Sequence, residues 1–551
     1  MFKKIIKIAV SFSKLERYIF LGALVIFAVA AMFWLINFYD DVTRLAPQRG
    51  GHYTEGIVGQ PTSLNPLIAG ATDADRDLLE LFFDDLYELA DKIEVSDDKE
   101  TWIVTLKSGL YWSDGEPLTT ADVSFTLETI QNPDTQSPAF STWQGVVAQR
   151  VSDREIHFSL KNPYVFFVDN LRNLKIAPRH IFGNVPPSNL RLSNYNLEPV
   201  GSGPYKFISL EKEKSGFIRE YLLDTNDYYG GNRPFIETFK VVFFASENAA
   251  IQSFNRRDID GLGGLSPQRL DDLKIGHQTL NINMPRYYAI FINQSTNPAL
   301  KERAVRLALA AATDKAEVVS TIFDNQAIAV DGPIPTIVDG YSSDINNGGQ
   351  VLEDIKSSLD RAGWKLNEDG IREKTIDKRQ VKLEFVLQIP QVDFLIEASE
   401  IIAAQWAEVG VKINTIILSA TEVNDVIRNR NYSLLLFGNT LRGNPDIFSF
   451  WHSSERFYPG LNLSIYNNKS VDSLLEGIRQ DFNVESRKNK IVRLQELIRQ
   501  DQPAIFLFSP NYIYVANKDL SGFSPSIMVL ASDRFKNVES WFLKTSRVLK
   551  K

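Results

Sequence analysis

Residues 101–128 read TWIVTLKSGLYWSDGEPLTTADVSFTLE and predict three successive elements of local structure. Apolar and polar residues alternate as far as Leu110, which is the pattern of a half-buried strand. Asp114 and Gly115 then supply a tight turn, because both residue types tolerate a positive φ angle. Thr119 or Thr120 can cap a following helix. Local rules therefore explain the stretch as a strand, a turn and a helix, and leave its purpose open.

The length and composition of the whole chain indicate a folded protein with more than one lobe. Its 551 residues exceed the size at which a single hydrophobic core keeps growing. Hydrophobic residues make up 44% and aromatic residues 11%, which is enough for globular cores. The net charge of −8, with acids and bases interspersed, argues against nucleic acid as a partner. Because the chain has no cysteine, disulfides, thiolate metal sites and lipid attachment at cysteine are excluded.

Residues 18–38, YIFLGALVIFAVAAMFWLINF, contain no charge and as a helix would cross the roughly 30 Å hydrocarbon core of a membrane. Basic residues precede this run and two aspartates follow it: Lys3, Lys4, Lys7, Lys14 and Arg17, then Asp40 and Asp41. This bias predicts a cytoplasmic segment at 1–17 and a membrane protein whose remainder lies outside the cytoplasm. A cleaved signal peptide is the alternative, but the run is long and no small-residue cleavage site follows it. We expect an uncleaved single-pass anchor.

Beyond an expected linker at 39–53, strand patterns and helix patterns alternate along the chain. Helices are expected over 73–89, 121–130, 301–313, 353–362, 396–409, 471–479 and 485–499. Strand patterns begin near residues 55, 101, 155, 239, 287, 382, 411, 432 and 504. This alternation predicts α/β lobes, and the lack of a fixed-period repeat argues against solenoids and propellers.

The sequence carries no recognisable catalytic signature. Its histidines are far apart and lack metal-ligand spacing: His52, His157, His180, His277 and His452. No G-x-S-x-G elbow or phosphate-binding loop is present. The adjacent acids Asp84 with Asp85, and Asp97 with Asp98, are expected on solvated surface. Acids from distant segments could still form a glycosidase site, so an enzyme remains an alternative, although a less favoured one. We expect neither a metal nor a cofactor.

Several segments, taken in order, are similar to one protein family. Besides residues 102–127, they are PTSLNPL at 61–67, VGSGPYKF at 200–207, FNRRDIDGLGGLSP at 254–267, RAVRLALAAATDKAEVV at 303–319, LDRAGW at 359–364 and IAAQWAEVGVKIN at 402–414. Together they resemble the extracellular solute-binding proteins of peptide ABC transporters, family 5, of the oligopeptide- and dipeptide-binding type. The resemblance runs from about residue 56 to about residue 509.

This resemblance implies a two-lobed α/β ectodomain of the periplasmic-binding-protein-like class II type, closing about a hinge. The first lobe is expected at 54–290, with an inserted subdomain near 80–195. The second is expected at 291–503, and 504–551 would return to the first. A peptide or other solute would bind in the cleft between the lobes and be delivered to the permease subunits of an ABC importer, without catalysis.

The ligand positions of the family fall on four short segments, where an extended peptide would be held as an added strand. They are Gly70, Ala71 and Thr72; Gly263 and Gly264; Tyr287 and Tyr288; and Phe437, Gly438, Asn439 and Thr440. At each position a purely structural role is the alternative, with the glycines serving turns and the tyrosines a core.

The sequence departs from the family where an acid often holds the amino terminus of a peptide. The aligned position is about Leu441, and Arg442 is the nearby charge. A desolvated ammonium without a carboxylate would lose on the order of 2–5 kcal/mol. Either Asp446 takes over by a shift in register, or the ligand is not held by a free amine, and Arg442 would suit a carboxylate or a polar ligand. Peptide is the leading ligand. An oligosaccharide or other solute, or a tethered sensory or structural role without transport, are the alternatives.

Overall fold

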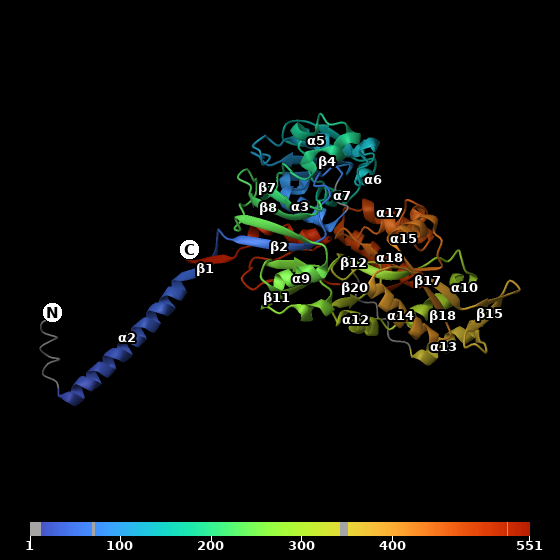
Figure 1. Ribbon diagram of the computed structural model, residues 1–551. Helices are drawn as coiled ribbons and strands as arrows, with labels where there is room; N and C mark the ends of the chain where they lie inside the picture. The colour runs from blue at the N-terminus through green and yellow to red at the C-terminus, as the bar shows by residue number, and fades with distance from the viewer. Residues whose placement is uncertain (1–12, 69–71, 342–350, 526, 551) are drawn as a thin grey trace.

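The structure, a computed structural model, describes residues 13–68, 72–341, 351–525 and 527–550. Two lobes lie side by side, and a long N-terminal helix projects away from them (Figure 1). The chain therefore has the two-lobed mixed architecture that the sequence predicted, with a single helical extension.

The first lobe is built on two sheets that share one large cluster of buried apolar side chains. The seven-stranded sheet has the order β11 (His277–Ile282), β21 (Tyr512–Asn517), β10 (Gly261–Gly263), β2 (His52–Val58), β9 (Thr238–Phe244), β8 (Ile218–Thr225) and β7 (Tyr205–Lys212). The four-stranded sheet has the order β3 (Ala90–Val95), β4 (Thr101–Leu106), β6 (Glu155–Ser159) and β5 (Val147–Arg150). The helices are α3 (Asp73–Phe82), α4 (Leu86–Leu89), α5 (Thr120–Gln131), α6 (Phe140–Trp143), α7 (Phe167–Leu171), α8 (Arg179–Phe182) and α9 (Glu247–Asn255).

The second lobe is built on a six-stranded sheet with a core on each face. Its order is β13 (Ala327–Ala329), β20 (Ala504–Pro510), β12 (Arg286–Ile292), β19 (Leu434–Thr440), β17 (Glu384–Pro390) and β18 (Lys412–Leu418). A three-stranded sheet, β14 (Lys365–Leu366), β15 (Arg372–Ile376) and β16 (Arg379–Lys382), adjoins it. Successive side chains of a strand point to opposite faces, so Ile290 and Ile292 enter one core while Ala289 and Phe291 enter the other.

Helices complete both cores of the second lobe. They are α10 (Pro298–Lys301), α11 (Arg303–Ala311), α12 (Lys315–Phe323), α13 (Leu352–Arg361), α14 (Asp393–Ala407), α15 (Ala420–Asn429), α16 (Phe448–Trp451), α17 (Lys469–Gln480) and α18 (Val484–Asp501). Of these, α13, α17 and α18 lie within two residues of the predicted ranges 353–362, 471–479 and 485–499, and α14 begins three residues before the predicted range 396–409. The sequence did not predict α12, α15 and α16. The predicted helix at 301–313 begins instead as the short α10 and continues as α11.

The chain crosses between the two main sheets twice, after β11 and after β20. β11 and β21 are antiparallel neighbours in the first sheet, and β12 and β20 are antiparallel neighbours in the second. The two crossings therefore lie next to each other, as in a two-strand hinge. Residues 504–510, which the sequence assigned to the return into the first lobe, pair in the second sheet, and the return begins with β21.

The strand, turn and helix predicted for 101–128 are confirmed. β4 alternates between buried and half-buried residues, and Gly115 has a φ of +92° in the turn. Thr119 caps α5 by accepting a hydrogen bond from the Ala121 N–H at 3.2 Å, while the Asp122 carboxylate accepts from the Thr119 N–H at 2.9 Å. Sequence-local capping therefore fixes where α5 begins.

The single helix expected over 73–89 is instead two helices, α3 and α4. Phe83 is extended, and Asp85 starts α4 by accepting a hydrogen bond from the Glu88 N–H at 2.9 Å. A distant segment sits against the break. The Gly203 N–H donates to the Phe82 carbonyl at 2.8 Å, and a Cβ on Gly201 would lie 1.9 Å from that same oxygen. The break leaves Asp84 and Asp85 between the helices.

Replacing Gly201 with alanine should lower the free energy of unfolding by about 1–3 kcal/mol, the usual cost of overpacking. The new methyl group would overlap a backbone carbonyl that cannot rotate away. Urea unfolding followed by tryptophan fluorescence measures the change. Gly332→Ala is the matched control, because a Cβ there meets nothing within 4 Å. Equal stability of the two variants would contradict the close packing assigned to Gly201.

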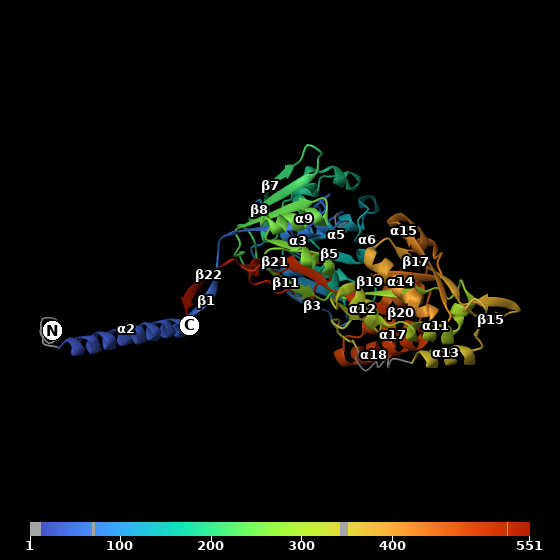
Figure 2. The same ribbon diagram turned by 60° about the horizontal axis from the view of Figure 1, so that its bottom comes forward.

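Helix α2 (Lys14–Val42) contains the predicted span at 18–38 and is, within the described residues, the helix long and apolar enough to cross a membrane. The region expected as a linker contains the end of α2 and strand β1 (Thr43–Gln48). β1 pairs antiparallel with β22 (Lys544–Leu549). This ribbon joins α2 to the body, and the C-terminus lies beside the end of the helix (Figure 2).

Candidate functional site

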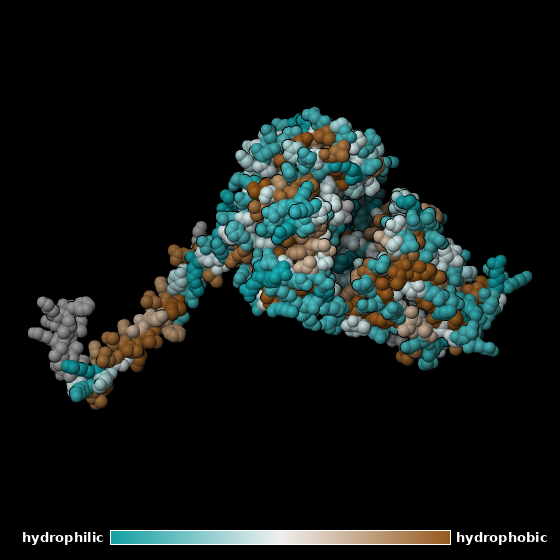
Figure 3. Space-filling model, in the orientation of Figure 1, coloured by the Kyte–Doolittle hydropathy of each residue, from teal (hydrophilic) through white to brown (hydrophobic). Residues whose placement is uncertain are grey.

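A pocket of about 390 Å³ lies between the two lobes. The space-filling view shows the groove that separates the lobes on one face (Figure 3). The first lobe forms most of the pocket wall, and Arg442 and Gly443 approach from the second. Acids outnumber bases in the wall: Glu80, Asp84, Asp85, Glu88, Asp169 and Glu539 against Arg172, Arg442 and Lys536.

Asp84 and Asp85 do not lie on solvated surface, so that expectation was wrong. Asp85 is 6% exposed, Asp84 is partly buried, and both line the pocket. The nearby Lys175 is already occupied, because its Nζ binds Glu80 at 3.0 Å and the Phe83 carbonyl at 2.7 Å. Within the described residues Asp84 has no ion-pair partner. The break after α3 is the cause, because it carries both acids into the interlobe wall.

Burial raises the pKa of these carboxyl groups. The pKa of Asp85 rises to about 7, with Lys175 opposing the shift. Burial also raises the pKa of Asp84 well above its usual range, and the charges of Asp85 and Glu88 add to that effect. The pKa of Glu539 is raised, again mainly by burial. A cation entering this pocket would favour the charged forms and relieve their mutual repulsion.

The free energy of unfolding should fall as pH rises from about 4 to about 7, by up to about 1.4 kcal/mol per pH unit from Asp85. In this window the folded protein keeps a proton on Asp85 that the unfolded chain has released, because the folded pKa is about 7. Urea unfolding at a series of pH values, compared with Asp85→Asn, isolates the effect. Asparagine keeps the helix cap without titrating. If the free energy of unfolding changed with pH in the same way in both proteins, Asp85 would be ionised throughout this range.

The Arg442 side chain contacts the first lobe beside the pocket. Its guanidinium donates to Asn170 at 3.1 Å and to the Thr142 hydroxyl at 3.2 Å. The neighbouring Asn444 amide donates to Asp169 at 2.6 Å. These contacts connect the segment after β19 to the first lobe. They would break if the two lobes moved apart.

The segment around Arg442 offers no unpaired carboxylate within the described residues, because position 441 is a leucine and Asp446 is already paired. Leu441 is buried, with 1% exposure. The Asp446 carboxylate accepts hydrogen bonds from Arg479 Nε at 2.9 and 3.1 Å and from the Tyr164 hydroxyl at 2.8 Å. Asp446 is therefore already paired, and it ties the first lobe to α17.

Six predicted residues are brought together on the paired strands β12 and β19. Tyr287 lies opposite Asn439, and Tyr288 lies opposite Gly438. Tyr287 is fully buried, and its hydroxyl accepts a hydrogen bond from the Asn439 amide at 3.0 Å. Tyr288 packs against the Phe508 ring at 5.6 Å. Tyr287 thus lies in the core and Tyr288 is half-buried, and a ligand role for either stays a prediction.

The free edge of β19 lies on its other side. β17 pairs with β19 only at Leu434 and Leu435. The later residues Phe437–Thr440 have no strand neighbour on that side within the described part of the chain. A free backbone edge is what an extended peptide needs to add as a strand. The role of this segment stays a prediction that the geometry accommodates.

The remaining predicted positions lie apart from the pocket wall. Gly263 ends β10, and a Cβ there would lie 1.9 Å from the Tyr512 hydroxyl, so close packing requires a glycine. Gly264 follows with a φ of +79°. Thr72 caps α3 by accepting from the Asp75 N–H at 3.0 Å. Gly70 and Ala71 lie outside the described residues, so the structure says nothing about them.

Sequence reasoning missed most of the pocket wall, above all Glu80, Asp84, Asp85, Tyr229 and Glu539. One signal was available. The run LELFFDDLYEL at 79–89 places two adjacent acids inside an apolar stretch, where both cannot be solvated without exposing leucine and phenylalanine. Tyr229 and Glu539 come from distant segments and have no such local signature.

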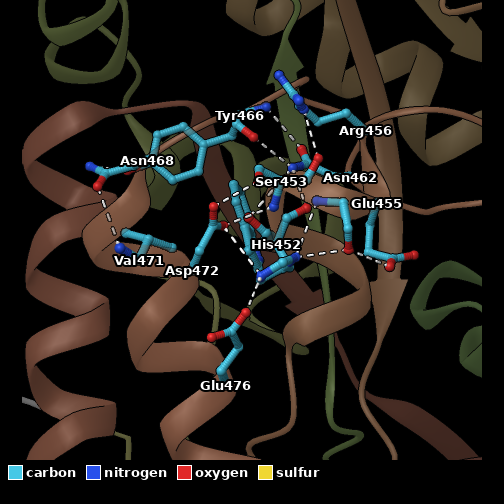
Figure 4. A network of polar contacts seen from close by, with 12 residues as sticks. His452, Ser453, Glu455, Arg456, Asn462, Tyr466, Asn468, Val471, Asp472 and Glu476 are labelled. Carbon is cyan, nitrogen blue, oxygen red and sulfur yellow. Dashed lines mark hydrogen bonds and ion pairs between the residues drawn. The ribbon is translucent and has the colours of Figure 1, made fainter.

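His452 belongs to a polar network in the second lobe (Figure 4). Its Nδ1 lies 2.8 Å from the Ser454 hydroxyl, and its Nε2 lies 3.4 Å from Glu476 and 3.8 Å from Asp472. Ser453 donates to Asp472 through both its N–H and its hydroxyl. The network fastens the segment after α16 to α17. Within the described residues, no group of three or more acids and histidines is placed to hold a metal ion.

Comparison with known proteins places the fold in context. Residues 87–457 match the family described as bacterial extracellular solute-binding proteins, family 5. The chain is 27% identical over 516 residues to the oligopeptide-binding protein AppA of Bacillus subtilis strain 168, covering 90% of this chain and 92% of that one. It is 23% identical over 479 residues to a probable D,D-dipeptide-binding periplasmic protein, DdpA, of Escherichia coli K12, covering 84% and 85%.

Solved structures agree with this match. The structure of Bacillus subtilis AppA in complex with a nonapeptide superposes with a TM-score of 0.71 at 26% identity, covering 91% of this chain and all of that one. The substrate-binding protein CtaP of Listeria monocytogenes, at 22% identity, shares the fold with a TM-score of 0.77 over 90% of this chain. The chain therefore belongs to the bacterial extracellular solute-binding proteins, family 5.

Proposed function

We propose that this protein is the peptide-binding component of an ABC importer, held at the outer face of the cytoplasmic membrane by α2. The observation that carries the proposal is the acidic pocket between the lobes of a family 5 protein, because Asp84 in its wall has no ion-pair partner within the described residues and lies where a ligand would be enclosed. AppA, which this chain resembles, is described with a bound nonapeptide. The family itself is one of extracellular binding proteins, so no catalytic step is proposed.

The ligand's amino group would be held by Asp84 and Asp85 rather than by an acid near Leu441. These two carboxyls lie in the same interlobe pocket that Arg442 borders from the second lobe. The backbone of the peptide would add to the free edge of β19 at Phe437–Thr440. Gly263, Gly264 and Thr72, which lie apart from the acidic pocket wall, would border other parts of an extended ligand. Permease subunits would receive the peptide from the closed form.

The anchor supports the same function. Residues 18–38 lie within α2, none of whose described residues is buried, so this apolar helix needs an apolar medium. An uncleaved helix would keep the binding protein close to its permease and raise its effective concentration there. Protease added to intact cells should accordingly digest the residues beyond Asp41.

Thermal denaturation of the full chain in detergent tests the ligand class. A pool of free peptides at about 100 times the dissociation constant should add about 2.7 kcal/mol to the free energy of unfolding and raise the melting temperature. N-acetylated peptides of the same sequences should stabilise the protein much less. Stabilisation by oligosaccharides and not by peptides would overturn the peptide assignment and keep the importer. If neither pool raised the melting temperature, a tethered role without transport would be favoured.

A further inference from the structure

The ribbon formed by β1 and β22 is unusually exposed for a sheet. Of its residues only Thr43 is buried, while Leu45 is 64% and Leu549 is 72% exposed. An isolated two-stranded ribbon is marginally stable in water, because neither face is covered. The ribbon therefore gains stability from any other surface that it contacts.

Both strands of the ribbon are fastened to the end of α2. The Lys550 N–H donates to the Val42 carbonyl at 2.8 Å, and Lys550 Nζ donates to the Asp40 carbonyl at 3.2 Å. Arg547 forms an ion pair with Asp40, donates to the Thr43 hydroxyl at 3.1 Å and lies 5.1 Å from the centre of the Tyr39 ring. The last residues of the chain thus brace the point where α2 would leave the membrane.

The two faces of the ribbon differ, because one carries two exposed leucines and the other carries two cations that form no ion pair within the described residues. Residues directly opposite in an antiparallel pair share a face, so Leu45, opposite Arg547, lies on the same face as Leu549, opposite Thr43. Arg547 is the residue of that face that touches the helix end, so this face turns toward α2. Arg44, opposite Val548, and Lys544, opposite Gln48, lie on the other face. Neither strand contains an acid.

We propose that the ribbon lies within the lipid headgroup layer of the outer leaflet, with Leu45 and Leu549 facing the acyl boundary and Arg44 and Lys544, on the opposite face, paired with anionic headgroups. The proposal rests on the membrane anchor of the proposed function. Chain continuity fixes the location, because β1 begins at the residue after α2 ends. Exposed leucines beside lysine and arginine are the composition of interfacial elements. Contact along two strands would set the tilt of the lobes relative to the membrane.

The chain has no cysteine, so single cysteines can be labelled cleanly in the full-length protein. A polarity-sensitive fluorophore at Leu45→Cys or Leu549→Cys, in phosphatidylcholine and phosphatidylglycerol vesicles, should be blue-shifted. Lipid brominated near the headgroup should quench it. Ile26→Cys, near the middle of the predicted span, is the control for insertion and should be quenched by lipid brominated near the ends of its acyl chains. Leu192→Cys, on the first lobe and 80% exposed, is the control for a solvated label and should be neither shifted nor quenched.

The controls separate the two possible failures. Quenching at residue 26 together with solvent-like labels at 45 and 549 would overturn the ribbon contact while leaving the anchor in place. Absence of quenching at residue 26 would overturn the anchor, and the ribbon proposal with it. The charge-reversed pair Arg44→Glu with Lys544→Glu should weaken quenching at 549 in anionic vesicles but not in pure phosphatidylcholine. Lys214→Glu, on the exposed turn between β7 and β8, should change neither. Equal quenching of charge-reversed and unmodified protein in anionic vesicles would overturn the headgroup contact.

Discussion

Replacing Arg534 with methionine should lower the free energy of unfolding by about 3–5 kcal/mol. Arg534 lies in the C-terminal segment, and its guanidinium binds Glu55 of β2 at 3.0 Å and Asp77 of α3 at 2.7 Å. The three side chains are 2%, 0% and 3% exposed. Methionine would fill the space but leave two carboxylates buried without a cation. The large effect follows from that uncompensated charge rather than from lost packing.

A charge-balanced variant separates these causes. The combination Arg534→Met, Glu55→Gln and Asp77→Asn should recover much of the lost stability, because no ion then remains buried. The Tyr514 hydroxyl, which donates to Glu55 at 2.7 Å, can donate to glutamine as well. Urea unfolding followed by tryptophan fluorescence compares the variants. Arg256→Met is the control: its pair with Asp258 is 62% and 53% exposed and should contribute at most about 1 kcal/mol. Equal losses in the single and triple variants would contradict the charge argument.

Elements defined by neighbouring residues were predictable from the sequence. β4 and α5 follow from alternation and from the Thr119 cap, and α18 follows from helical periodicity. α3 was predicted to continue through Asp84 because the apolar periodicity does continue. Its end depends on Gly201 and Gly203, which approach Phe82 from more than a hundred residues away. No local pattern at 73–89 contains that information.

The candidate site likewise contains residues that the sequence pointed to and residues that it did not. Arg442, which the sequence analysis named as the charge near Leu441, lines the pocket, while its role toward a ligand stays a prediction. The acidic wall opposite it was missed, because the burial of Asp84 depends on how α3 ends. The Arg534 cluster and the β1–β22 ribbon join the two ends of the ectodomain, so their partners are hundreds of residues apart in sequence. Such pairings cannot be predicted from neighbouring residues and become visible only in the folded chain.

Converting Asp84 and Asp85 to asparagine should weaken the binding of free-amine peptides by about 30-fold or more at pH 7.5, which corresponds to at least about 2 kcal/mol. Asparagine keeps the size of each side chain and the cap on α4, so the change removes charge and little else. Isothermal titration calorimetry measures the dissociation constants. The double variant should bind N-acetylated peptides as weakly as the unmodified protein does.

Asp97→Asn with Asp98→Asn is the matched control, because this second adjacent acid pair is exposed and carries the same charge. It should leave peptide affinity unchanged. Because the pKa of Asp85 is raised to about 7, peptide binding below neutral pH must release a proton from it, so affinity should rise between pH 5.5 and about 7.5. That slope should shrink in the double variant. An equal loss of affinity for acetylated and free-amine peptides would show that the two aspartates shape the pocket without holding the amine, and the ligand's amino group would then have to be sought elsewhere along the cleft.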